Sequence, residues 1–368
     1  MLDYLYFFFT GFSITNRFGV IIFWILLPIS ILTLIIISRK KINIPTGYIY
    51  FFLTSLFFII LYYIHPYITG EYTSRLNSNF YLSFTGLFIS FIYFSTNDNI
   101  DKSHKYINAI LVIHIISFYS QFILYYLFNY TLDYHSILGG SGSRFYWGSL
   151  FRATGFFDEP AVYSLHITTL LVINYLLQKK FSLLSYIAIF SLFLSFSFIA
   201  IAQGILLLAL TMKNKKAWFL SFLLIIVFLL LFKENIISRY DSFIQGGDGS
   251  NNTKIETILE LFTTNKIYYG FGLVGSHASF PLYYQGLYDL TYWGANLTIF
   301  GLFVGTAINI IVITFLIRTL SIREFLLVNV ALIKLSVPMY SVYWLFAFFL
   351  IWYKRNNNDT KNIYTTRN

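Results

Sequence analysis

Long apolar runs separated by short polar connectors dominate this chain. A helix that crosses a membrane needs about 20 apolar residues. By that measure, crossing helices are predicted over residues 19–37, 48–64, 80–95, 107–128, 160–177, 217–232 and 292–317. The pattern therefore predicts an all-α protein, built as a polytopic transmembrane helical bundle.

Two further apolar runs are too long for one helix. Residues 181–210 can break at Ser195-Phe-Ser197, where small polar residues interrupt the run. Residues 325–352 can break at Ser336-Val-Pro338, because proline disrupts a helix interior. With both interpreted as hairpins, the total is about 11 spans. Residues 2–14 are apolar but short, so they form either an interfacial helix or a twelfth span.

Lysine and arginine orient the spans, because these residues concentrate in short cytoplasmic loops. With Arg39-Lys-Lys41 in the cytoplasm, alternation puts most of the 25 Lys and Arg residues inside. Most of the 15 acidic residues, Asp3 among them, fall outside. Two long segments then face outward, residues 129–159 and 233–291. The whole chain, residues 1–368, is predicted to form one membrane domain. Its functional site is expected in these two outward segments, because sites are commonly built on loops.

Composition supports the membrane class. Hydrophobic residues make up 57% of the 368 residues and charged residues 11%, whereas soluble domains are about 25% charged. The net charge of +10 therefore indicates cytoplasmic loops and not nucleic-acid binding. Because the chain has no cysteine and no metal-ligand spacing, we predict no disulfide, metal or other cofactor.

The first outward segment ends in Arg152-Ala-Thr-Gly-Phe-Phe-Asp-Glu-Pro160. Proline suits the first position of a helix, so Asp158 and Glu159 are expected at a helix N-terminus at the membrane rim. Charges there are unfavourable unless solvated, paired or functional. Arg152 also lies on the side where positive charge is disfavoured. We interpret it as functional, with a snorkelling surface arginine as the alternative.

A glycine-rich stretch, Gly139-Gly-Ser-Gly-Ser-Arg144, precedes that motif. Backbone N–H groups in such stretches converge on anions, and arginine binds phosphate through two parallel hydrogen bonds. The alternative is a flexible linker, which the glycines alone favour. Arg144 remains a candidate phosphate ligand.

The second outward segment carries Arg239 and Tyr240 just after a span. Thr253-Lys-Ile-Glu256 fits a capping box, which marks a helix start. An amphipathic helix is predicted there at the membrane surface, with Lys254 on its polar side. Its apolar stripe consists of Ile255, Ile258, Leu259 and Phe262.

Aromatic residues are dense in the rest of this segment, from Tyr269-Gly-Phe-Gly272 past His277 to Asp289. They form either an interfacial belt or a surface for stacking against sugars. Two other histidines, His114 and His166, fall inside spans, where a lone histidine more often hydrogen bonds between helices than binds a ligand.

These motifs, in this order, resemble those of the bacterial O-antigen polymerases of the Wzy type, relatives of the O-antigen ligases. One feature is the pattern Arg-x-x-Gly-x-Phe-x-Glu-Pro at 152–160, which opens a span. The others are a serine-rich break followed by Gly204, Ser238-Arg239-Tyr240 after a span, and the Tyr-Gly-Phe-Gly turn followed by Gly301-Leu-Phe-Val-Gly305. The many spans and large outer loop of that family match most of the chain.

The resemblance implies a GT-C-like fold and a metal-independent glycosyltransferase of the bacterial inner membrane, active on the periplasmic face. The implied partners are two undecaprenyl-diphosphate-linked glycans, membrane lipid and a chain-length regulator protein. The growing polysaccharide would move from its lipid diphosphate to the non-reducing end of a new repeat unit.

That implied reaction assigns roles to the candidate residues. A diphosphate leaving group needs cationic stabilisation. The acceptor hydroxyl needs a base, unless Glu159 only orients Arg152. The candidate cations are, in order, Arg152, Arg239, Arg144 and Lys254. The candidate bases are Glu159, Asp158 and Asp289. Further substrate contacts are predicted for Tyr163, Tyr240 and His277.

Three alternatives remain open. An O-antigen ligase would commonly carry a histidine before the span that follows the large loop. This chain has Tyr288-Asp-Leu-Thr-Tyr-Trp293 there, which favours the polymerase. A lipid-linked oligosaccharide flippase or transporter predicts charges among the spans and an internal repeat. A scaffold protein leaves the outward arginines unexplained.

Overall fold

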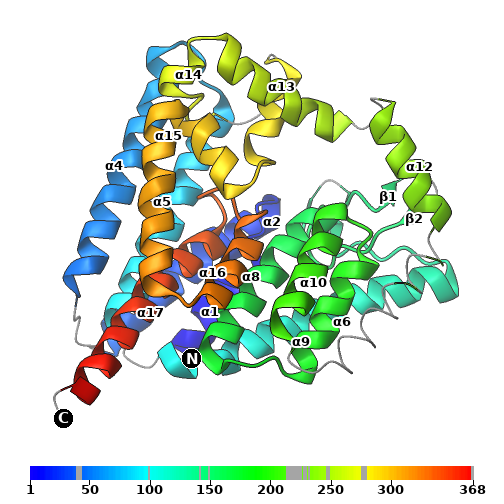
Figure 1. The fold of residues 1–368 in the computed structure, drawn as a ribbon. Coiled ribbons are helices and arrows are strands. Elements are labelled where there is room, and N and C mark those ends of the chain that lie inside the picture. The colour runs from blue at the N-terminus through cyan, green and yellow to red at the C-terminus, as the bar shows by residue number, and fades with distance from the viewer. Residues whose placement is uncertain are drawn as a thin grey trace.

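The computed structural model describes residues 1–38, 44–97, 100–140, 142–147, 150–212, 226, 230, 233–245, 249–274 and 280–365. The chain is mostly helical, at 78%, and has little strand. Figure 1 shows a helical bundle with smaller elements gathered over one end. The predicted all-α class is therefore confirmed.

Five helical segments are long and apolar enough to cross a membrane, which fits a membrane protein. They are Val20–Ile37, Thr46–Ile68, Ile100–Phe128, Pro160–Gln178 and Tyr292–Thr319. The first consists of η1 (Val20–Leu26) and α3 (Leu27–Ile37), and the second is α4. The third joins η2 (Ile100–Ser103) to α6 (His104–Phe128), and the last two are α8 and α15.

Helix α8 is the centre of the bundle. Most of its apolar window, 83%, is buried inside the protein. It contacts α6, α16 (Ile322–Leu332) and the two shorter helices α9 (Leu183–Leu194) and α10 (Phe198–Thr211). Its N-terminus therefore has a fixed position within the bundle.

Both predicted breaks in the long apolar runs are confirmed, whereas the total of about 11 spans stays a prediction. Helices α9 and α10 are separated at Ser195–Ser197, where Phe196 has a φ of 51°. The second run divides into α16 (Ile322–Leu332) and α17 (Ser341–Thr365), with residues 333–340 between them. The predicted span over 217–232 lies outside the described residues, apart from positions 226 and 230.

The bundle has two distinct ends. The loop end carries β1 (Tyr146–Trp147), β2 (Leu150–Phe151), α12 (Lys233–Ile244), α13 (Gly249–Thr263), α14 (Lys266–Tyr269) and η3 (Leu282–Tyr288). At the opposite tail end, Lys179 after α8 pairs with Glu324 at the start of α16. Among the described residues, the two partners of every salt bridge are predicted by the alternating topology to lie on the same side of the membrane.

Helix α1 (Leu2–Phe12) runs inside the bundle between its two ends. At the tail end, Asp3 accepts hydrogen bonds from Tyr93 (2.7 Å) and Asn97 (2.6 Å) near the end of α5 (Ser74–Thr96). Just beyond the helix, Asn16 donates to the carbonyl of His135 in the first outward segment. The placement of Asp3 with the outer acids was therefore wrong, because the N-terminus of α1 packs against the end of α5, at the tail end.

Helix α15 (Tyr292–Thr319) is not straight, as one span over 292–317 would be. Gly301 has a φ of 78° and a ψ of 169°, which breaks the helix. Asn309 donates to the carbonyl of Trp293 (3.0 Å), and Asn296 donates to the side chain of Asn309 (2.8 Å). Such distant residues meet only if the helix folds back, since each residue adds about 1.5 Å. Residues 292–300 therefore lie antiparallel to 302–319.

The Tyr-Gly-Phe-Gly turn at 269–272 packs against this break. Phe271 and Gly272 donate backbone hydrogen bonds to the carbonyls of Thr298 (2.8 Å) and Ile299 (3.0 Å). A Cβ on Gly270 would lie 2.3 Å from the carbonyl oxygen of Ile299. Glycine is needed at 270 because the two backbones touch. Two of the sequence motifs are thus parts of one contact.

Candidate functional site

Charged residues from three separate parts of the chain meet at the loop end. We call them the charged cluster: Arg144, Asp158, Glu159, Asp289 and Lys334. The first three come from the segment before α8, Asp289 from the second outward segment, and Lys334 from the break between α16 and α17.

The N-terminus of α8 positions the two acidic residues. Pro160 is the first residue of the helix and Glu159 is its N-cap, as predicted. The carboxylate of Glu159 lies 3.5 Å from the guanidinium of Arg144. The carbonyl of Asp158 accepts the backbone N–H of Arg144 at 2.7 Å. The positive end of the helix dipole also favours carboxylates at this place.

Arg152 shapes the loop that carries Arg144. It follows β2, and its backbone N–H donates to the carbonyl of Phe145 at 2.7 Å. Its guanidinium donates to the carbonyl of Arg144 at 3.1 Å. Arg152 therefore holds the backbone of Arg144, whose own side chain is exposed and paired with Glu159.

Gln121 of α6 fixes the middle of the motif, and the sequence analysis missed it. Its side-chain oxygen accepts the N–H groups of Thr154 (3.0 Å) and Gly155 (2.8 Å). Its amide donates to the carbonyl of Gly155 at 3.0 Å. Gly155 has a φ of 61°, a conformation that glycine adopts readily. The sequence feature that could have revealed Gln121 is that it is a lone glutamine inside an apolar span.

The glycine-rich stretch is organised by the chain's own carboxylate. Asp133 accepts the N–H of Ser143 at 2.9 Å and its hydroxyl at 2.7 Å. Burial alone would raise the pKa of Asp133, but these hydrogen bonds and those from Ser136 hold it below its usual value. The expectation of an external anion therefore has no support at Ser143, because Asp133 already uses its N–H.

Asp289 and Lys334 form the buried part of the charged cluster. The ammonium of Lys334 lies 2.6 Å from the carboxylate, and its side chain is only 7% exposed. Burial would raise the pKa of Asp289, but Lys334, with Lys254 and Arg144 further away, holds it below its usual value. Arg144 and Lys254, which are distant in sequence, thus both act on Asp289.

Tyr340 lies beside the same carboxylates and was not singled out from the sequence. Burial, followed by the charges of Asp158, Asp289 and Glu159, raises the pKa of its phenol. Its ring lies 5.8 Å from that of His166. Lys334 was likewise counted only as an outward charge. Its position in an apolar run just before a proline break was the available signal.

Three candidates inside the spans belong to the core. Tyr163 is fully buried and its hydroxyl lies 2.7 Å from that of Ser191, so the predicted substrate contact has no support from its position. A ring nitrogen of His114 lies 2.9 Å from the carbonyl of Gly11 in α1, so its helix–helix role is confirmed. His166 contacts the carbonyl of Val162 in its own helix and stacks on Phe157.

The remaining candidates come from the second outward segment. Arg239 lies on α12, whose backbone is described, but its side chain is outside the described residues, as is all of His277. Tyr240 is exposed on the same helix. The role of Arg239 as a cation for the diphosphate therefore stays a prediction.

Helix α13 differs from its predicted form. It starts at Gly249, and the hydroxyl of Thr253 donates to the carbonyl of Gly249, so the predicted capping box at Thr253 was wrong. The side of α13 that faces the protein carries the buried residues Thr257 and Leu261, and the predicted apolar stripe does not face the protein. All four stripe residues, Ile255, Ile258, Leu259 and Phe262, are exposed. Contact between this stripe and a membrane surface remains a prediction.

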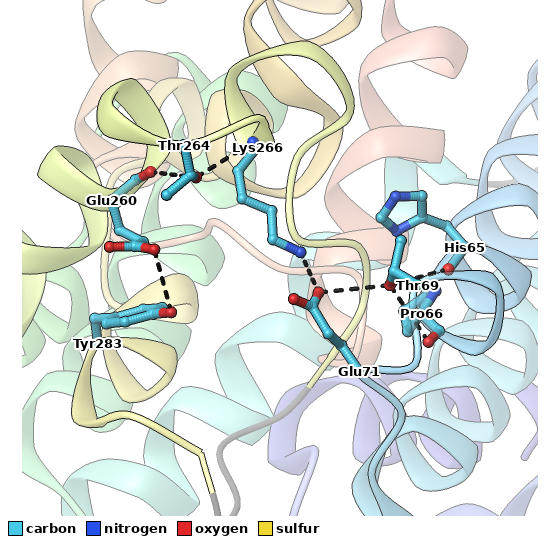
Figure 2. Close-up of polar contacts among 8 residues, drawn as sticks. All are labelled: His65, Pro66, Thr69, Glu71, Glu260, Thr264, Lys266 and Tyr283. Atoms are coloured by element: carbon cyan, nitrogen blue, oxygen red, sulfur yellow. Dashed lines mark hydrogen bonds and ion pairs between the residues drawn. The ribbon is translucent and has the colours of Figure 1, made fainter.

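A second polar contact at the loop end joins Lys266, Glu71 and Thr69 (Figure 2). Lys266 of α14 forms an ion pair with Glu71, which lies between α4 and α5. The ammonium lies 5.4 Å from the ring centres of both Tyr269 and Phe271. Thr69 contacts the same carboxylate at 3.5 Å. We call this contact the clamp, because it joins the second outward segment to α4 and α5.

No family model, curated protein or solved structure matches this chain. Within the part of the chain that the structure describes, no group of three or more potential metal ligands occurs. The chemistry of the site must therefore be argued from its own side chains.

Proposed function

We propose that this chain is an O-antigen polymerase of the Wzy type. It would be a multi-pass protein of the bacterial inner membrane with about 11 spans and a GT-C-like fold. It would transfer an undecaprenyl-diphosphate-linked polysaccharide to a new lipid-linked repeat unit on the periplasmic face. The observation that carries the proposal is the charged cluster, where two outward segments and the α16–α17 break meet.

The cations of the cluster suit a diphosphate leaving group. Arg144 is the exposed one, with a side chain 71% exposed, and Arg152 holds its backbone. Lys254 acts on the same carboxylate, Asp289. In this proposal Arg144 and Lys254 contact the diphosphate and stabilise its developing charge. Arg152 is a positioning residue, and Arg239, whose backbone lies on α12, keeps its predicted role as a cation for the diphosphate.

Two carboxylates of the cluster differ in their suitability as a base. A base works best when its pKa is near the working pH. The pKa of Asp289 is lowered, so this group takes up a proton less readily and better serves to position Lys334. Glu159 is partly exposed and paired with Arg144, whose side chain is 71% exposed. The proposal therefore gives the base role to Glu159, with Asp158 beside it.

The experiment is the lipopolysaccharide ladder of a deletion strain complemented with variants at matched protein level. Arg144→Ala, Arg152→Ala, Arg239→Ala and Glu159→Gln should each remove the long chains and leave core that carries single repeat units. Lys233→Ala, at an exposed position of α12, is the control and should give the normal ladder.

Two outcomes would count against the proposal. Normal ladders from Arg144→Ala and Arg152→Ala would show that the cluster does not bind the leaving group. Bare core in the deletion strain would identify the O-antigen ligase instead, because a ligase attaches the polysaccharide to lipid A-core.

A further inference from the structure

An apolar groove of about 720 Å³ has no residue of the charged cluster in its lining, although Leu335 and Ser336, which follow Lys334, line one end. Its walls are α4, α15 and α17, which run along one side of the bundle in Figure 1, and the α16–α17 break closes its loop end. Only 17% of the apolar stretch of α4 and 22% of that of α15 are buried inside the protein. The groove therefore lies on a face that a membrane protein turns toward lipid.

The two ends of the groove differ in charge. At the loop end it is lined by uncharged residues, Leu273, Tyr292, Ser336 and Pro338. At the tail end it is lined by Lys354 and Arg355, close to Pro45 and Gly47 at the start of α4. Both charged residues in the described lining are basic, and both are at the tail end.

The basic end has a defined geometry. The ammonium of Lys354 lies 4.9 Å from the ring centre of Phe315, inside the groove wall on α15. Arg355 is exposed, and its charge interacts electrostatically with the hydroxyl group of Tyr48 on α4. The two cations thus face the apolar space from α17, with rings of two other helices beside them. This arrangement fits an amphiphile with an anionic head and a long apolar chain.

We propose that this groove binds an anionic phospholipid from the leaflet at the tail end. Its phosphate contacts Lys354 and Arg355, and an acyl chain lies along α4 and α15. Basic pockets between transmembrane helices on the cytoplasmic side bind such headgroups, and each cation near the surface adds to the attraction. The proposal uses no residue of the charged cluster and does not depend on the function proposed above.

A polyprenyl diphosphate is the competing occupant, since its head would lie at the loop end. The lining there has no cation to receive it. Lys334, the nearest lysine, is buried and paired with Asp289. Charge complementarity therefore favours an anionic head at the tail end.

Binding is tested on the purified full-length protein by native mass spectrometry and by thermal shift. Phosphatidylglycerol and phosphatidylcholine with identical acyl chains are the probes. The first should bind and raise the unfolding temperature, whereas the second should do neither. The double variant Lys354→Gln/Arg355→Gln should weaken phosphatidylglycerol binding roughly 30-fold, since each cation contributes about a factor of five.

The matched control is Lys105→Gln/Lys180→Gln, which removes two exposed cations predicted on the same side and should bind like the wild type. A second variant, Ile308→Trp/Ile311→Trp, fills the groove and leaves both cations intact. It should also weaken binding, whereas helix content by circular dichroism should be unchanged in all variants.

Equal binding of the two lipids would overturn the proposal, as would an equal loss in the control variant. A polyprenyl diphosphate that displaces phosphatidylglycerol and binds Lys354→Gln/Arg355→Gln normally would assign the groove to the polyprenyl chain and also overturn it. The ladder experiment is independent, so its failure would leave this result standing.

Discussion

Two lysine–carboxylate pairs lie at the loop end of the bundle, and their burial is nearly the same. The side chains of Lys334 and Lys266 are 7% and 9% exposed. Their partners, Asp289 and Glu71, are 35% and 27% exposed. Both pairs join a residue near the second outward segment to the transmembrane bundle.

Their surroundings differ. Lys266 lies against the rings of Tyr269 and Phe271, so its ion pair closes a packed contact. The Asp289–Lys334 pair lies among further charges, because Arg144 and Lys254 act on Asp289. A buried ion pair alone is thus weak evidence for a site. Additional charges of both signs, brought from separate parts of the chain, distinguish the charged cluster from the clamp.

The largest expected effect is on stability, at the clamp. Lys266→Met leaves Glu71 without its cation, so the free energy of unfolding should fall by about 3–5 kcal/mol. Lys266→Met/Glu71→Gln should recover most of this loss, because neither residue then carries a charge. Chemical unfolding of the detergent-solubilised protein measures both. An unfolding curve for Lys266→Met that matches the wild type would remove the distinction between the pairs.

The next effect is on activity, at the charged cluster. Lys334→Met/Asp289→Asn also removes both charges and should remain folded. Under the proposed function, its polymer output should fall roughly 100-fold, as when one charge-stabilising group is removed from an active site. Lys266→Met/Glu71→Gln is the matched control, and its output should follow the amount of folded protein. Equal ladders from the two double variants would show that both pairs are structural.

A smaller effect is expected at the contact that seats the Tyr-Gly-Phe-Gly turn. Gly301→Ala should destabilise the protein by about 1–3 kcal/mol, because its φ is 78° and a Cβ would lie 2.7 Å from the carbonyl oxygen of Tyr268. Gly47→Ala, whose Cβ meets nothing closer than 3.8 Å, is the control and should not destabilise. Thermal unfolding distinguishes them, and equal midpoints would contradict the folded-back form of α15.

The smallest effect concerns pH. Because the pKa of Asp289 is lowered in the folded protein, its ion pair stabilises fully above the unfolded value of about 3.9. The contribution is lost only as pH falls through the lower folded value. The difference in unfolding temperature between wild type and Asp289→Asn should therefore stay constant from pH 7 to about 5. A difference that shrinks within this range would indicate a raised pKa.

Local sequence signals predicted the helices well, and contacts over long distances explain the failures. Pro160 correctly marked the start of α8, and the breaks at 195–197 and 336–338 were confirmed. The predicted start of α13 was wrong, because the helix begins four residues before Thr253. The straight span at 292–317 was also wrong, because the turn at 269–272 packs against the break at Gly301. Arg152, ranked first from the sequence, positions the backbone of Arg144, which the sequence ranked lower.

The sequence by itself determined the class of protein, because apolar length and scarcity of charge are local properties. It also placed most candidate charges at the loop end, because alternating spans assign sides without any knowledge of packing. Only the tertiary structure decided which charges meet: Arg144 with Glu159, Asp289 with Lys334, and Lys266 with Glu71. Partners up to 195 residues apart are selected by how helices pack, and no local pattern encodes that choice.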